Sequence, residues 1–154
     1  MISFAWRDDL SVGNTFIDND HRHLIGLLNN LFVAIDQGTG PDMLGPVLDD
    51  LIQYTQEHFK REEDVMRAIR YDGFFEHKEE HERLTKEVLE TQRRFIAGET
   101  DLSAEVMMFL HDWLFEHITK VDIKLAKAIK DDKSRAEYQA QDMQGRRQVG
   151  PASK

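Results

Sequence analysis

Four stretches of this 154-residue chain carry apolar residues at every third or fourth position. That spacing is typical of amphipathic α-helices and does not fit the strict alternation of a half-buried strand. Breakers separate the stretches at Gly38-Thr39-Gly40-Pro41, at Tyr71-Asp72-Gly73 and at Gly98. Helices joined by short loops predict an all-α fold, an up-down-up-down antiparallel four-helix bundle.

The apolar stripes also give approximate bounds. The helices are expected from about Asp18, as N-cap, to Gln37; from about Asp42 to Arg70; from Phe74 to Ala97; and from near Asp101 or Ser103 to Ile129. Residues 1–130 would therefore form one domain, in which residues 1–16 are an irregular N-terminal arm. Residues 131–154 have little apolar content, which predicts a frayed helix followed by a flexible, disordered tail.

Composition excludes several classes of function. The chain has 29 Asp+Glu against 20 Lys+Arg, and its net charge of -9 argues against a nucleic-acid partner, which would require a basic face. Without cysteine, the chain cannot use thiolate catalysis or iron–sulfur clusters, and any metal must be held by histidine and carboxylate. The chain start does not resemble a signal peptide, and no apolar run approaches the roughly 18 residues of a membrane span. We therefore expect a monomeric cytoplasmic protein without membrane insertion.

Polar residues interrupt the apolar stripes. These are His21 in the first helix, His58 and Glu62 in the second, His77 and His81 in the third, and His117, followed by Asp122, in the fourth. Burying several imidazoles and a carboxylate costs several kcal/mol unless a partner satisfies them. A metal cation would be such a partner.

Topology predicts that these seven residues meet. In an antiparallel bundle, the starts of the odd helices and the ends of the even helices share one end of the molecule. All seven residues lie within a few turns of those helix ends. They should converge a turn or two inside the end that holds the Tyr71-Asp72-Gly73 loop.

The spacing in the last helix is unusual. His117 and Asp122 are five residues apart, which turns them about 140° from each other on an ideal α-helix. Either Asp122 reaches around from the edge of the stripe, or the helix contains a π-type bulge. Two further histidines, His23 and His111, lie off the stripes, and we expect both to be exposed to solvent.

Two other metal-protein classes are disfavoured. The segment from His77 to His81 matches the H-x-x-E-H pattern of inverted zinc peptidases, but a helical chain lacks the strand-rich cleft of such an enzyme. Carboxylate-rich di-iron bundles use E-x-x-H motifs, and this motif occurs nowhere in the sequence.

The pattern I17-D18-x-x-H21, H58-F59-x-x-E62-E63, H77-x-x-x-H81 and W113-L114-x-x-H117-I118-x-x-x-D122 resembles bacterial hemerythrins over residues from about 4 to 130. The resemblance implies two iron ions, one held by His77, His81 and His117 and the other by His21 and His58. It also implies that Glu62, Asp122 and an oxo or hydroxo group bridge the ions. The implied O2 pocket is walled by Leu24, Phe59, Trp113, Leu114 and Ile118.

This ligand set favours reversible binding over oxidation. Five neutral imidazoles with two anions stabilise high-valent iron less than four carboxylates would, and an apolar wall keeps out water and protons. We therefore expect a non-haem di-iron protein for oxygen transport, storage or delivery, not an enzyme, with an O2-consuming enzyme as recipient. The alternatives are an O2- or redox-sensing module and a di-iron enzyme acting on peroxide or nitric oxide.

Overall fold

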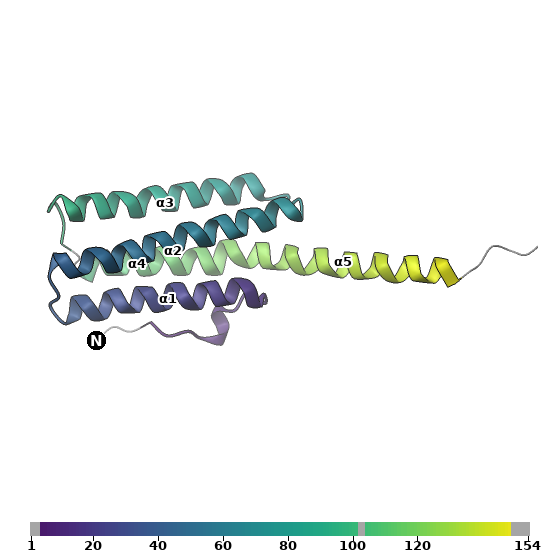
Figure 1. Ribbon diagram of the computed structural model, residues 1–154, viewed down its shortest axis with the longest axis horizontal. Helices are drawn as coiled ribbons and strands as arrows, with labels where there is room; N and C mark the ends of the chain where they lie inside the picture. Colours follow the sequence, from purple (N-terminus) through teal and green to yellow (C-terminus); the bar gives the residue numbers. More distant parts are fainter. Residues whose placement is uncertain (1–3, 102–103, 149–154) are drawn as a thin grey trace, which may run out of the picture.

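The computed structural model describes residues 4–101 and 104–148, and these residues form helices without a strand. The elements are the 3₁₀ turn η1 (Asp8–Leu10), α1 (Thr15–Asp36), α2 (Pro41–Ala68), α3 (Phe74–Ile96), α4 (Ala104–Glu116), the π-helical η2 (His117–Asp122) and α5 (Ile123–Gln148). Helices α1 to α4 lie side by side, and α4, η2 and α5 follow one another as a single long helix (Figure 1). The predicted all-α four-helix bundle is confirmed.

The start of α1 differs from the prediction. Asn14 is the N-cap, and its side chain accepts a hydrogen bond from the amide of Ile17 at 2.9 Å, so the helix begins at Thr15. Asp18, the expected cap, is buried inside the helix, where its carboxylate accepts a hydrogen bond from the amide of Val12 at 2.9 Å. Asp18 therefore fastens the N-terminal arm to the bundle instead of capping α1.

Glycine ends two of the helices, as the sequence predicts. Gly38 follows α1 with a φ of 72°, and Gly98 follows α3 with a φ of 70°. Both angles lie in the left-handed region that favours glycine at helix C-termini. The chain can therefore reverse direction directly after each helix.

The N-terminal arm covers part of α1 and α4. The amide of Phe4 donates a hydrogen bond to the side chain of Asn29 at 2.7 Å, and the Phe4 ring lies 3.9 Å from the ring of His111. His111 is half-buried between Phe4 and Phe115, so its predicted solvent exposure is wrong, because the arm packs over it. His23 is exposed, as predicted.

The apolar core consists of two clusters along the bundle axis. The larger contains Leu24 and Ile118, and the smaller, near the loop between α2 and α3, contains Ile17 and Leu125. On α1, His21 lies between Ile17 and Leu24, so a polar level separates the two apolar clusters. Apolar packing on both sides keeps this level away from solvent.

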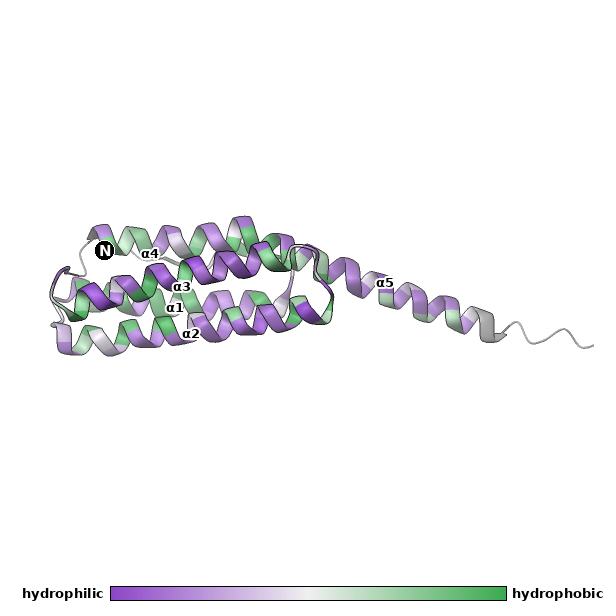
Figure 2. Cartoon of the chain, turned by 90° about the horizontal axis from the view of Figure 1, so that it is seen from above, coloured by the Kyte–Doolittle hydropathy of each residue, from purple (hydrophilic) through white to green (hydrophobic). Residues whose placement is uncertain are grey.

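Helix α5 extends beyond the bundle (Figure 1). The segment expected as a frayed helix is helical up to Gln148, and residues 133–145 are exposed. Hydrophilic residues dominate this projecting part (Figure 2). The disordered end predicted for the tail falls on residues 149–154, outside the described residues, and stays a prediction. None of the described helices has the length and apolar character needed to cross a membrane.

Candidate metal centre

All four helices of the bundle bring polar side chains to the same level. Every one of these side chains is buried, with relative exposures of 0 to 4%. They come from α1 (His21), α2 (His58 and Glu62), α3 (His77 and His81) and η2 (His117 and Asp122). The predicted convergence of the seven residues is therefore present in the structure.

The segment η2 explains how Asp122 joins the group. Residues His117–Asp122 form a π-helix, which has more residues per turn than an α-helix. Two residues five positions apart then lie nearly above one another, so both His117 and Asp122 face the interior. Of the two sequence-based expectations, the π-type bulge is confirmed.

Two histidines approach one side of the carboxylate pair. The Nε2 atom of His21 lies 2.7 Å from Oδ2 of Asp122, and Nε2 of His58 lies 2.9 Å from Oε1 of Glu62. The two imidazole rings are 5.0 Å apart. These two oxygens therefore face a pocket of two histidines.

Three histidines approach the other side through the remaining oxygens. Nε2 of His81 lies 3.0 Å from Oε2 of Glu62, and Nε2 of His117 lies 3.0 Å from Oδ1 of Asp122. Nε2 of His77 lies between them, 3.2 Å from Oε2 and 3.1 Å from Oδ1. Each carboxylate thus presents one oxygen to each group of histidines.

The residues fit a pair of metal ions. Although these atoms are close, Nε2 of His58, His77 and His117, Oε1 of Glu62 and Oδ1 of Asp122 have no hydrogen-bond partner among the described residues. Buried polar atoms almost always have partners, and unaligned close approaches indicate donors directed at a shared point. Two overlapping sets of buried ligand atoms could each hold an ion, and both sets include Glu62 and Asp122. Imidazole nitrogen and carboxylate oxygen suit iron, zinc, manganese and cobalt.

Electrostatic coupling polarises the site without metal. Burial favours the neutral ring of His117, but the Coulombic attraction and hydrogen bond of Asp122 outweigh it and raise the pKa of His117 to about 9. Burial and the charge of Asp122 act to protonate Glu62, yet His58 and the other imidazoles hold the pKa of Glu62 well below its ordinary value. The carboxylates are therefore anionic at neutral pH and ready to bind a cation.

Comparison with known proteins agrees with the geometry. The family of the Hemerythrin HHE cation binding domain matches residues 12–129. The chain belongs to the hemerythrin family. A bacteriohemerythrin of Stenotrophomonas maltophilia is 39% identical over 130 residues, covering 84% of each chain. One of Methylococcus capsulatus is 36% identical over 107 residues, covering 70% of this chain and 81% of its own.

A solved structure supports both the family and the fold. The crystal structure of a wild-type hemerythrin aligns with a TM-score of 0.76 at 32% sequence identity, covering 81% of this chain and 96% of the hemerythrin. The resemblance inferred from the ligand pattern is thereby confirmed.

This hemerythrin chain has an outer layer of partners that the sequence analysis missed. Nδ1 of His58 lies 2.8 Å from Oδ2 of Asp20, which also accepts a hydrogen bond from Arg61 at 2.9 Å. Tyr54 donates its hydroxyl to the other oxygen of Asp20 at 2.8 Å. Burial opposes the charge of Asp20, but hydrogen bonds from His58, Arg61 and Tyr54 lower its pKa well below the ordinary value. Asp20 therefore orients His58 as a permanent anion.

A second outer carboxylate orients His81. Nδ1 of His81 lies 3.1 Å from Oε1 of Glu63, while its Nε2 faces Glu62. The only sequence signals for these outer residues are adjacency, since Asp20 precedes His21 and Glu63 follows Glu62. Adjacency alone does not show which histidine each carboxylate contacts.

The five residues expected to wall an O2 pocket are buried together. All belong to the larger core cluster: Leu24, Phe59, Trp113, Leu114 and Ile118. Phe59 stacks on His81, with ring centroids 3.9 Å apart and planes inclined by 9°. Trp113 donates its indole N–H to the carbonyl oxygen of Leu84 at 3.2 Å. The wall is thus apolar and in contact with the candidate ligands.

Proposed function

We propose that this protein binds O2 reversibly at a di-iron centre bridged by an oxo or hydroxo group. Three histidines would hold one ion and two the other, with both carboxylates shared between the ions. The proposed ligands are His21, His58, Glu62, His77, His81, His117 and Asp122.

The observation that carries the proposal is the unequal division of histidines around the two carboxylates. Glu62 and Asp122 each present one oxygen to either side, but three imidazoles approach one side and two approach the other. An ion on the side of His21 and His58 would have one protein ligand fewer and an open coordination position. When bound, two ferrous ions would supply the electrons and the Lewis acidity on which O2 affinity depends.

The surrounding residues would protect this position from protons. Leu24, Phe59, Leu114 and Ile118 offer no ionisable group, and the indole N–H of Trp113 is already bonded to Leu84. The wall thus provides no free proton donor and excludes water. Since protons and water promote irreversible oxidation of ferrous centres, this environment favours release of unchanged O2.

The optical spectrum of the anaerobically iron-loaded protein, cycled between argon and air, tests the proposal. We expect visible bands that depend on iron, appear under air and vanish under argon over several cycles. A permanent change to a ferric spectrum on first exposure to air would contradict reversible binding. Steady consumption of peroxide or nitric oxide with a reductant would instead identify an enzyme.

One observation favours a second candidate, a sensing role. Helix α5 starts at Ile123, directly after Asp122, and projects from the bundle (Figure 1). A change in coordination at Asp122 could therefore be transmitted along α5 to a partner. Carriage predicts an O2-consuming enzyme as recipient, whereas sensing predicts a partner that binds only one ligation state.

A further inference from the structure

A groove on the surface between α2 and α3 reaches the metal centre. Its volume is about 720 Å³, within the range of small-molecule sites. The lining residues that matter here are Phe59, Lys60 and Glu63 from α2 and His81, Lys86 and Leu89 from α3. One proposed iron ligand, His81, is therefore part of the groove.

The floor of the groove is apolar and aromatic. The rings of Phe59 and His81 are stacked nearly parallel, 3.9 Å apart, and both residues line the groove. Leu89 is 40% exposed and widens the apolar surface toward solvent. A flat, apolar molecular body fits such a surface, because stacking and burial both stabilise it.

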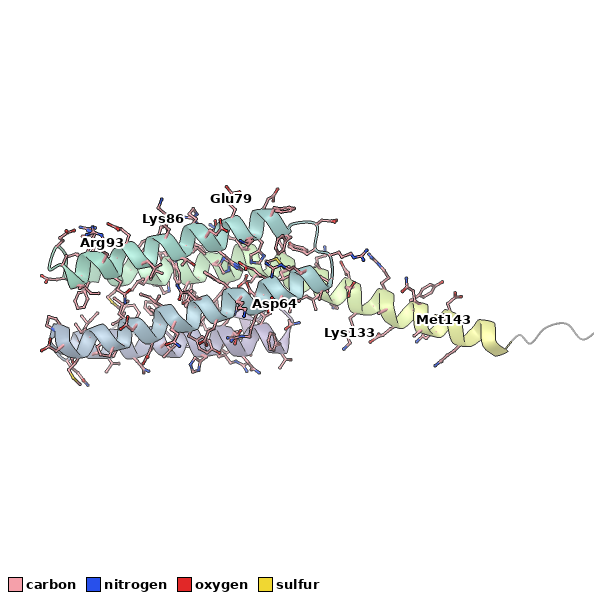
Figure 3. All side chains as sticks on the ribbon, turned by 45° about the horizontal axis from the view of Figure 1, so that its top comes forward. Asp64, Glu79, Lys86, Arg93, Lys133 and Met143 are labelled. Atoms are coloured by element: carbon pink, nitrogen blue, oxygen red, sulfur yellow. The ribbon has the colours of Figure 1, made fainter. Side chains whose placement is uncertain are left out.

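The charges along the groove are not balanced. Its acidic side chains are engaged: Glu63 with His81 at 3.1 Å, Glu82 with Lys78 at 2.7 Å and Glu90 with Arg93 at 2.7 Å. Within residues 4–101 and 104–148, by contrast, neither Lys60 nor Lys86 has an ion-pair or hydrogen-bond partner. Lys86 extends from α3 on the same helix as Arg93 (Figure 3). Two free ammonium groups beside an apolar floor complement an anion with a planar body.

We propose that this groove binds a redox-active planar aromatic anion, of the flavin nucleotide class, which reduces the metal centre through His81. The inference rests on the proposed function for the identity of the electron acceptor. A reduced flavin would give up two electrons and release two protons to solvent, and each of two ferric ions would accept one electron. The flavin returns to its oxidised form and the ions become ferrous, ready to bind O2 again.

Binding is tested with flavin mononucleotide and with riboflavin, which lacks the phosphate, by equilibrium dialysis against the metal-loaded protein. We expect flavin mononucleotide to bind more tightly than riboflavin. Replacing both lysines (Lys60→Ala with Lys86→Ala) should weaken the nucleotide by about tenfold and remove the difference between the two flavins. The matched control, Lys124→Ala with Lys127→Ala on α5, should leave both affinities unchanged.

A floor variant tests the apolar part of the groove. Leu89→Glu should weaken both flavins, whereas Met108→Glu should not, although the two side chains have similar exposures of 40% and 42%. The far-ultraviolet circular dichroism of both variants should match the parent. No binding of either flavin, or equal losses in the groove and control variants, would overturn the proposal.

Electron delivery is tested separately, by anaerobic stopped-flow mixing of reduced flavin mononucleotide with the ferric protein. The reduction rate should saturate with flavin concentration and should lose saturation in the double lysine variant. A rate that rises linearly in both proteins would overturn electron transfer from a bound flavin. Because dialysis does not depend on O2 chemistry, flavin binding without reversible O2 binding would refute the proposed function and not the groove.

Discussion

At the scale of single residues, each ligand histidine depends on both of its ring nitrogens. Nε2 faces the metal centre, while Nδ1 of His58 and of His81 lies against an outer carboxylate. Such partners fix the tautomer and the ring orientation and increase the basicity of the ligand nitrogen. Asp20 is itself held by Arg61 and Tyr54, so the orientation of His58 is set by residues of two helices.

Asp20→Asn should therefore weaken metal binding while preserving the fold. Loss of an outer carboxylate typically lowers metal affinity by about 10- to 100-fold. A competition titration of ferrous iron against a chelator measures the change. Asp50→Asn, an exposed change on α2, is the control. Equal affinities for both variants would show that Asp20 does not support His58.

The pKa of His117 predicts a pH dependence of the metal-free protein. Because Asp122 raises this pKa to about 9 against burial, the protonated ring stabilises the fold fully below its unfolded pKa of about 6.5. That contribution is lost as pH rises to about 9, so the metal-free protein should become less stable across this window. Metal loading displaces the proton and should abolish the trend. Urea unfolding at several pH values measures it, and a metal-free protein that gains stability toward pH 9 would contradict the assignment.

The seven central residues could be predicted from sequence because each polar side chain occupies a position in an apolar stripe. Asp20 and Glu63 could not, since their roles depend on which neighbouring helix packs against them. His111 was assigned to solvent for a related reason, because the irregular arm that carries Phe4 has no periodicity to place it.

At the scale of elements, the π-helical segment η2 is the feature that completes the site. His117–Asp122 place two ligands five residues apart on one face, and α5 resumes in register with Leu125 in the smaller core cluster. A π-bulge is equivalent to one residue inserted into an α-helix. The unusual spacing made it one of two options from sequence, and the helix packing decides between them.

Deletion of the exposed Thr119 should convert η2 to an α-helix without moving the inward face. His117 and the aspartate would then be four residues apart, which also places them on one face. We expect a folded protein that still binds metal. Deletion of the exposed Asp112 in α4, the control, should turn part of the helix by about 100° and disrupt the core. Thermal melting and metal content measure both, and equal damage in the two variants would contradict this account.

At the scale of the whole molecule, the bundle and the projecting part of α5 have different roles. Every residue of the metal centre belongs to the bundle, whereas residues 133–145 are exposed. Periodicity identified the bundle, but it could not predict that α5 continues as a helix, because the low apolar content there resembles that of a tail.

Deleting residues 131–154 should leave the fold and the site intact. We expect the melting temperature to change by no more than a few degrees and the metal content per chain to stay the same, because the removed side chains lie outside the bundle. Sedimentation should show a monomer before and after deletion. Loss of metal or of cooperative melting would show that α5 supports the bundle.

The central claim is that two metal ions share Glu62 and Asp122. Anomalous diffraction at the iron edge from crystals of the ferrous-loaded protein tests it directly. The account predicts two iron peaks about 3.5 Å apart, one beside His21 and His58 and the other beside His77, His81 and His117. A single peak, or a second peak that does not contact both carboxylates, would contradict it.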